Sequence, residues 1–355
     1  MWTCLGIFLN ILAYGWLKSF NISQVILSVF SGILAGWVIA YFGFSNLANK
    51  NVNRILAYPK KVCVFAFQEW KSYILIVFMM FIKCVLLIIL LFGNLYSQIS
   101  VKINRTIYLP SEFHQNNFQP NRFSVSQTGF YFLDSENRQV AFSSNDGAIV
   151  FAGGYGTDND AFIDPIEILS SRLRTIVIDR TENKLIEFDH KLNYLRTINF
   201  DPIYPEFSGI DDWGNVLLQS DQEQKIFVGN PSLENFDEFV DLSIYKNINS
   251  CISDVHVASD GSIGILSNCN NYVHLFNRLG KLDVKYPIDE SIGKFLIKLK
   301  ENWLIVSVGG ELTSIRYNEK TKLPIEEDIL DVSQMDGSLY ILSSNKIWVV
   351  DVWME

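Results

Sequence analysis

The chain has 355 residues and a net charge of −9, and its composition divides near residue 100. Residues 1–100 hold seven of the 29 basic residues and one of the 38 acidic residues, so the rest of the chain holds 22 basic and 37 acidic residues. This acidic balance argues against a nucleic-acid partner, because phosphate contacts need clustered Lys and Arg. The five cysteines show no Cys-x-x-Cys or Cys/His spacing, so the sequence predicts no zinc site and no cofactor.

Three apolar stretches in the first hundred residues predict α-helices that span a membrane. They cover residues 2–17, 25–44 and 73–92, and a helix needs about 17 to 25 apolar residues to cross the hydrocarbon core. Five of the seven basic residues lie between Asn46 and Lys71. The positive-inside bias therefore places this loop in the cytoplasm and the remainder of the chain on the far side of the membrane.

The third stretch carries a charge, Lys83, at its middle, where insertion costs about 2.5 to 3.5 kcal/mol. One interpretation is that Lys83 is a buried partner for an ion or a substrate. A second is that a neighbouring helix or the membrane interface satisfies the charge. In a third, residues 73–98 contain an internal secretory signal that is cleaved near Gln98. All three place the following domain outside the cytoplasm, and cleavage would make it a secreted protein.

The segment from Asn53 to Tyr73 carries the pattern Leu56-Ala57-Tyr58-Pro59-Lys60-Lys61, followed by an aromatic-rich stretch. It resembles an uncharacterised family of short multi-spanning bacterial membrane proteins. The resemblance covers about the first 80 residues. It implies a location in a bacterial inner membrane, and it implies no activity.

Residues 164–195 predict four short β-strands. The runs are about five residues long, rich in β-branched and aromatic side chains, and separated by polar turns at residues 180–183 and 190–193. A single four-stranded meander cannot bury both of its faces, so it needs copies of itself as neighbours.

Such copies recur along the chain. The position before the second strand of each unit is found six times, at intervals of 45, 40, 47, 41 and 35 residues, which suits four-stranded propeller blades. These reference positions are Gly129, Arg174, Gly214, Gly261, Asn302 and Gly337. The sequence therefore predicts an all-β six-bladed propeller, preceded by an α-helical transmembrane region.

The last unit is one strand short, whereas a spare strand, residues 106–109, precedes the first blade. Pairing this strand with the last blade would close the ring and remove the exposed strand edges that promote aggregation. The propeller would then cover residues 105–355. Residues 94–104 are predicted to be a linker, after a membrane region that ends at residue 93.

Several motifs carry a second resemblance. Gly153-Gly154-Tyr155-Gly156, Phe162, Asp164-Pro165 and the strands 176–179 and 185–189 resemble NHL-type six-bladed propellers. The match is good across residues 150–195, but blade two has Arg174 in place of the usual Gly, and blade five lacks the aspartate that ends the second strand. The resemblance implies recognition of a partner through loops on one face of the ring.

Cys251 and Cys269 each lie nine positions from Asp260, the middle residue of a predicted hairpin turn at residues 259–261. Antiparallel pairing about that turn would bring the two sulfur atoms within disulfide reach. Export would place them in an oxidising compartment, so we predict a disulfide, with two independent buried thiols as the alternative.

Two further groups of polar residues are candidates for chemistry. Asp158, Asp160 and Asp164, with Asn159, crowd one loop and could hold calcium, but the loop lacks the glycine and distal glutamate of an EF-hand, so the sequence favours a solvated turn. Asp254 and His256 share one face of the innermost strand of blade four. They could act as an orienting carboxylate and a general base, or as a packed hydrogen-bonded pair.

The sequence favours a binding or scaffolding module on the periplasmic side of a bacterial inner membrane, with a protein or another extracytoplasmic ligand as its partner. Candidate surface aromatics are Tyr155, Trp213, Tyr245 and Tyr272. The acidic charge favours a partner of basic or polar character. One alternative is a propeller enzyme that uses channel carboxylates and a metal ion. The other is a sensor or transport component in which the N-terminal spans and Lys83 carry the function.

Overall fold

The computed structural model of this chain describes residues 99–171, 174–230, 235–245, 248, 251–288 and 293–354. The chain divides into two units, Met1–Gly93 and Asn94–Glu355. The predicted spans at residues 2–17, 25–44 and 73–92, together with Lys83, lie outside the described residues. In the part of the chain that is described, no helix combines the length and apolarity that a membrane crossing requires.

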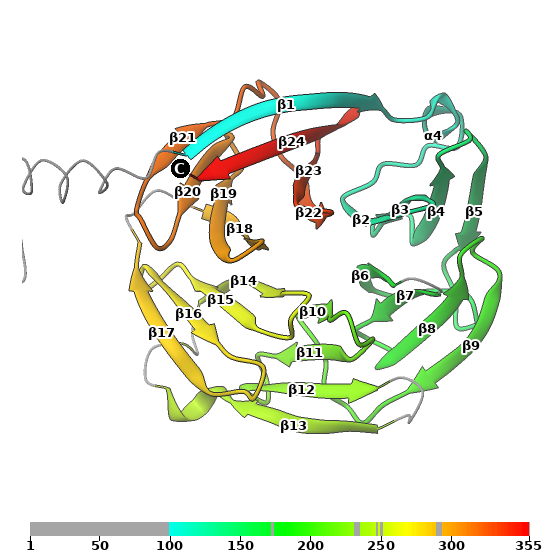
Figure 1. Cartoon of the computed structure of the whole chain (residues 1–355). Coiled ribbons are helices and arrows are strands. Elements are labelled where there is room, and N and C mark those ends of the chain that lie inside the picture. The colour runs from blue at the N-terminus through cyan, green and yellow to red at the C-terminus, as the bar shows by residue number, and fades with distance from the viewer. Residues whose placement is uncertain are drawn as a thin grey trace, which may run out of the picture. The chain divides into compact units, whose positions relative to one another are not determined.

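The described residues of the second unit form six four-stranded antiparallel sheets arranged around a central opening (Figure 1). A short helix, α4 (Ser111–Gln115), and a 3-10 turn, η2 (Leu242–Ile244), accompany them. From the innermost strand outward, the sheets are β2 (Arg122–Ser126), β3 (Gly129–Asp134), β4 (Gln139–Ser144) and β5 (Ile149–Gly153); β6 (Pro165–Ser170), β7 (Arg174–Asp179), β8 (Lys184–Asp189) and β9 (Tyr194–Asn199); β10 (Phe207–Ile210), β11 (Val216–Ser220), β12 (Lys225–Asn230) and β13 (Asn235–Asp241); β14 (Ile252–Val257), β15 (Ile263–Ser267), β16 (Tyr272–Phe276) and β17 (Leu282–Pro287); β18 (Gly293–Leu299), β19 (Asn302–Ser307), β20 (Glu311–Ser314) and β21 (Lys320–Lys322); and β22 (Asp331–Met335), β23 (Ser338–Leu342), β24 (Lys346–Met354) and β1 (Ile99–Tyr108).

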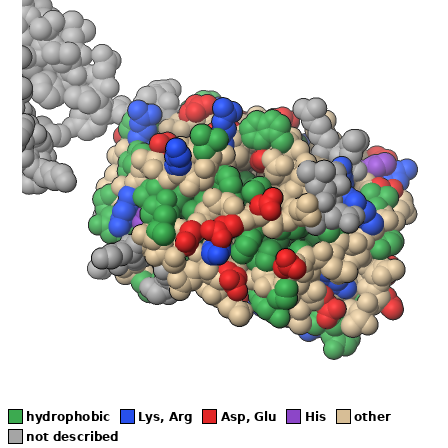
Figure 2. All heavy atoms as spheres, turned by 90° about the horizontal axis from the view of Figure 1, so that it is seen from below, with side chains coloured by type: hydrophobic (Ala, Val, Ile, Leu, Met, Phe, Trp, Pro, Cys, Tyr) green, Lys and Arg blue, Asp and Glu red, His purple; other side chains and the backbone are tan. Residues whose placement is uncertain are grey.

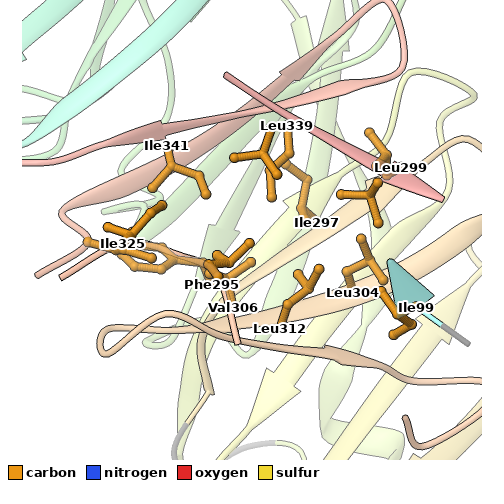
Figure 3. Packing of buried hydrophobic residues seen from close by; sticks show 14 residues of the cluster. Ile99, Phe295, Ile297, Leu299, Leu304, Val306, Leu312, Ile325, Leu339 and Ile341 are labelled. Carbon is orange, nitrogen blue, oxygen red and sulfur yellow. The ribbon is translucent and has the colours of Figure 1, made fainter. Parts of the chain in front are cut away.

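The hydrophobic core lies between neighbouring blades rather than in the middle of the ring. Because side chains alternate across a strand, each middle strand presents apolar groups to both adjacent blades. Between blades five and six, Leu339 and Ile341 of β23 pack with Ile297 and Val306, and all four are fully buried (Figure 3). Burying a side chain of this size contributes about 1.5 to 3 kcal/mol, so the six interfaces hold the ring together.

The spare strand before the first blade completes the last blade, where β1 pairs antiparallel with β24. The strand is longer than the predicted residues 106–109, because it begins at Ile99 and continues to Tyr108. Residues 99–104 were expected to belong to a linker, and this expectation was wrong. Ile99, Val101 and Ile103 alternate toward the core of blades five and six, whereas Lys102 is exposed, which is the alternation of an edge strand.

Glycine is required at two of the positions that the sequence singled out. Gly261, in the turn between β14 and β15, has φ +73°, which L-residues rarely adopt. Gly153 ends β5 with φ +83°, and a Cβ there would collide with the ring of Phe162. Phe162 is fully buried and packs 6.3 Å from Phe188 between blades one and two. The Gly-Gly-Tyr-Gly motif thus makes room for this ring.

Candidate functional site

A cavity of about 560 Å³ occupies the centre of the ring and is lined by the innermost strands of all six blades. These strands run in the same direction, because every blade repeats the same order from the inside outward. Equivalent positions of the six blades therefore meet at one level of the channel. Serines are frequent in its lining: Ser124, Ser126, Ser170, Ser171, Ser208, Ser259 and Ser333.

One such level holds three of the six carboxyl groups that line the cavity, together with Arg122. Each of its residues pairs with the equivalent position of the second strand of its blade, namely Leu133, Ile178, Leu218, Leu266, Val306 or Leu342. We call these six residues the channel ring: Arg122, Glu167, Ser208, Asp254, Phe295 and Asp331. The ring thus combines three carboxyl groups, one guanidinium, one hydroxyl and one phenyl group.

The polar side chains of the channel ring reach from one blade to the next. Arg122 Nε lies 3.5 Å from Glu167 Oε2. The carboxylate of Asp331 accepts the backbone N–H of Phe123 at 2.9 Å, and that of Asp254 accepts the backbone N–H of Leu296 at 2.5 Å. These backbone groups belong to the free edges of innermost strands, so the two aspartates also join neighbouring blades.

Burial changes the protonation of the channel ring. It raises the pKa of Glu167 to about 8, which Arg122 opposes and Asp331 reinforces. It raises the pKa of Asp254 to about 7, against the hydrogen bond from the Leu296 N–H and the charge of Arg122. Because 23% of the Glu167 side chain remains exposed, water in the channel reduces this effect of burial. At neutral pH the ring therefore holds protons that ordinary carboxyl groups would have released.

Asp254 and His256, the predicted acid–base candidates, both line the channel from β14. His256 Nε2 is buried and has no hydrogen-bond partner, and the imidazole lies edge-on to Trp303 at 5.9 Å. Burial and the charge of Lys298 lower the pKa of His256 to about 4, so its imidazole is neutral at pH 7. The channel brings the two residues together with Arg122, Glu167 and Asp331, which the sequence did not single out.

The fold is that of a six-bladed β-propeller. No protein-family model matches the chain, and no curated protein matches its sequence. Solved structures match in fold: virginiamycin B lyase from Staphylococcus aureus is 15% identical, with a TM-score of 0.50, over 72% of this chain and 88% of the enzyme. A catalytically inactive variant of that lyase with quinupristin is 13% identical, with a TM-score of 0.49, over 64% of this chain and 79% of the enzyme. The WD40 propeller domain of Doa1 is 11% identical, with a TM-score of 0.45, over 71% of this chain and 97% of that domain. At these identities the likeness shows the fold alone.

A disulfide joins Cys251 and Cys269, whose Cα atoms lie 5.4 Å apart. Cys251 directly precedes β14, and Cys269 lies in the turn between β15 and β16. The hairpin is symmetric about Asp260, as the spacing of the cysteines predicted, since Val257 pairs with Ile263. A bulge at Ser253 shifts the register by one residue, so that Cys251 lies opposite Asn268, next to Cys269. The disulfide holds the start of β14 three residues before Asp254.

The acidic side chains of the loop after blade one are not arranged as ligands of a metal ion. Asp164 forms an ion pair with Arg180 at 2.7 Å, and Asp158 contributes a backbone carbonyl to the turn that ends at Ala161. Among the described residues, no three Asp, Glu, His or Cys side chains converge as ligands for one metal ion. The predicted candidates Asp158, Asp160 and Asp164 are therefore not brought together as a metal site.

The four aromatic candidates fall into two pairs. Tyr155 and Trp213 are exposed on loops, at 73% and 59%. Tyr245 packs edge-on against Phe276 at 5.4 Å, and Tyr272 lies in β16 beneath the ammonium group of Lys285. Only Tyr155 and Trp213 are thus placed as surface aromatics.

Sequence reasoning missed most of the channel ring, although a signal for it was present. Each ring residue lies six or seven positions before the reference position of its blade, as Arg122 does before Gly129 and Asp331 before Gly337. Aligning the six units on that position, rather than reading each loop separately, would have shown four charged residues in one column.

Proposed function

We propose that this chain is an extracytoplasmic binding protein whose propeller, tethered to or exported across a bacterial inner membrane, takes up a ligand in its central channel. The observation that carries the proposal is the channel ring, with Glu167 and Asp254 held at raised pKa inside a cavity of about 560 Å³. Groups perturbed in this way cluster at functional sites, because a fold gains no stability from carboxyl groups that are costly to ionise.

The location is supported by two independent features. The disulfide between Cys251 and Cys269 suits an oxidising compartment outside the cytoplasm. The apolar stretches before residue 93 provide either an anchor or an export signal. The resemblance to NHL-type propellers adds the expectation that a partner is recognised at one face of the ring.

The acidic character of the domain supports a ligand or partner with positive charge. Figure 2 shows a side of the molecule on which acidic side chains gather around a basic one. On blade three, β13 carries Asp237, Glu238 and Asp241, and Lys225 pairs with Glu238 at 2.7 Å. Complementary charge raises the rate of encounter with a cationic ligand.

The location is tested by expressing the full chain with a C-terminal tag in bacteria and fractionating the cells. We expect the tag in the membrane fraction at full size or, after cleavage near Gln98, in the periplasm or medium at reduced size. In either case a protease added to spheroplasts should reach the propeller, and Cys251 and Cys269 should resist alkylation until they are reduced. A protease-protected cytoplasmic domain with alkylatable thiols would overturn the proposed location.

A further inference from the structure

We propose that the channel ring binds the cationic group of a small organic amine or guanidine. This inference rests on the proposed function, since it names the ligand class of the channel assigned there to binding. It is carried by the unequal charges of the ring, by an unpartnered buried hydroxyl at the same level, and by the spacing of the carboxyl groups.

The ring contains more negative than positive groups. When Glu167, Asp254 and Asp331 are all ionised, Arg122 is the single cation among the six ring residues, and its Nε lies 3.5 Å from Glu167 Oε2. Lys298, whose charge acts on His256 of the channel, is engaged by Asp260 at 2.6 Å. Asp254 has no ion-pair partner among the described residues, so an incoming cation would meet a carboxylate without a counter-ion in a channel partly shielded from water, where such attraction is stronger than in bulk water.

Ser208 gives an independent indication of a missing donor. It occupies the ring position of blade three, lines the same cavity and is 9% exposed, and its hydroxyl oxygen has no hydrogen-bond partner. Buried hydroxyls are normally paired, so an unpaired one calls for an explanation such as a ligand. Ammonium and guanidinium groups carry N–H donors that a hydroxyl oxygen accepts.

The arrangement suits an organic cation better than a compact metal ion. The three carboxyl groups come from blades two, four and six, and no set of three ligand side chains converges within the described residues. Asp254 and Asp331 already accept a backbone N–H from the neighbouring blade. Carboxyl groups on three different blades around a cavity of about 560 Å³ match a cation with distributed N–H donors or with two charged ends.

Protonation of the ring supports the same conclusion. Burial raises the pKa of Glu167 and of Asp254, while Arg122 opposes both shifts and Asp331 reinforces them. His256, the next polar residue along β14, is kept neutral by burial and by Lys298. A cationic ligand would favour the ionised carboxylates, so its binding should release protons and strengthen as the pH rises.

The test is isothermal titration of the full-length chain in detergent with cadaverine, which remains a dication from about pH 6 to about pH 9, and with uncharged 1,5-pentanediol. We expect cadaverine to bind at least about tenfold more tightly at the higher pH, with proton release that differs between buffers of different ionisation heat. 1,5-Pentanediol should not bind. Agmatine, which adds a guanidinium end, should bind in the same way.

Two ring variants and two matched controls locate the binding. At about pH 9, Glu167→Gln and Asp254→Asn should each weaken cadaverine binding about tenfold, which corresponds to the loss of one charge-assisted contact. The control substitutions Glu182→Gln and Asp201→Asn are at exposed positions and should leave binding unchanged. Thermal melting of each variant confirms that it is folded.

Three outcomes would overturn the inference: no binding of either amine at any pH, binding that the ring variants leave unchanged, or binding of Mg²⁺ or Ca²⁺ in place of amines. Because the titration uses purified protein and the proposed location is tested in cells, each can fail without the other. A propeller outside the cytoplasm that binds no amine would leave the location standing and remove the ligand class.

Discussion

Blades two and four share one plan of strands, yet they fasten the start of the innermost strand by different chemistry. In blade two, Asp179 ends β7 and accepts the backbone N–H groups of Ile163 at 2.6 Å, Asp164 at 3.3 Å and Glu182 at 3.2 Å. It thereby joins the segment before β6 to the turn after β7. We call this connection the entrance link.

Blade four has Ser267 at the position of Asp179, since Ser267 pairs with the first residue of β14 as Asp179 pairs with the first residue of β6. Ser267 is fully buried, and its hydroxyl has no partner. The disulfide from Cys251 to Cys269 joins the same two segments that the aspartate joins in blade two. A covalent bond has thus taken the place of a set of hydrogen bonds.

A propeller blade therefore needs its entrance link, and different residues can provide it. Blade one makes the link as blade two does, because Asp134 accepts the N–H groups of Gln119 at 2.6 Å and Asn137 at 2.9 Å. The innermost strand packs around the channel and has one free edge, so its start would fray without a second attachment. In blade four that attachment depends on the redox state of the compartment.

The largest effect is expected from removing the link of blade two. Asp179→Ala leaves three backbone donors without their charged acceptor, and each such loss costs about 1 to 3 kcal/mol. Because water can reach part of this loop, we expect the free energy of unfolding to fall by about 4 kcal/mol in urea titration. Asp201→Ala, at an exposed position, is the control and should have no effect. An equal, small change in both variants would show that the link is dispensable.

The next largest effect is expected from opening the disulfide. Cys251 and Cys269 are 18 residues apart, and closing a loop of this size stabilises a protein by about 3 kcal/mol. Dithiothreitol should therefore lower the melting temperature of the wild type to that of Cys251→Ser/Cys269→Ser and leave the double variant unchanged. A melting temperature that reductant does not change would show that the disulfide, unlike the link of blade two, contributes no stability.

Blades two and four each supply a ring carboxyl group whose pKa is raised by burial. The folded chain holds the Glu167 proton more tightly than the unfolded chain, whose Glu titrates near 4.5, so the stability of the wild type should fall as the pH rises from about 5 to about 8. Glu167→Gln lacks this loss. Allowing for water in the channel, it should be about 2 kcal/mol more stable than the wild type at about pH 9 and equal to it at about pH 5.

Denaturant titration at the two pH values measures this difference, with Glu182→Gln as the exposed control. A Gln variant less stable than the wild type at the higher pH would mean that Arg122 more than compensates for the burial of an ionised Glu167.

The smallest effect is expected from rebuilding the link of blade four in its alternative form. In the Cys251→Ser/Cys269→Ser background, Ser267→Asp places a carboxylate where Asp179 stands in blade two. We expect it to recover about 1 kcal/mol of the stability lost with the disulfide, because a cavity shaped for Ser will accommodate the larger side chain incompletely. In the wild-type background the same substitution should give no gain. A further loss in the double variant would contradict the equivalence of the two links.

Local sequence patterns are sufficient to define the blades. Their strands alternate with a period of two, and their turns contain residues such as Gly261, whose positive φ few other residues adopt, so local chemistry sufficed to count six units. The disulfide was also predictable, because Cys251 and Cys269 lie within one hairpin. The extent of β1 was not, since residues 99–104 become a strand only when β24 provides the other half of the ladder.

The channel site, in contrast, forms only when the blades assemble into the ring. Arg122, Glu167, Asp254 and Asp331 lie on four blades spread over more than 200 residues, and each alone looks like an ordinary polar residue at the start of a strand. Closure of the ring by β1 brings them to one level, where burial and mutual charge change their protonation. A repeat reveals itself in local patterning, whereas a site shared by all the repeats exists only once they are assembled.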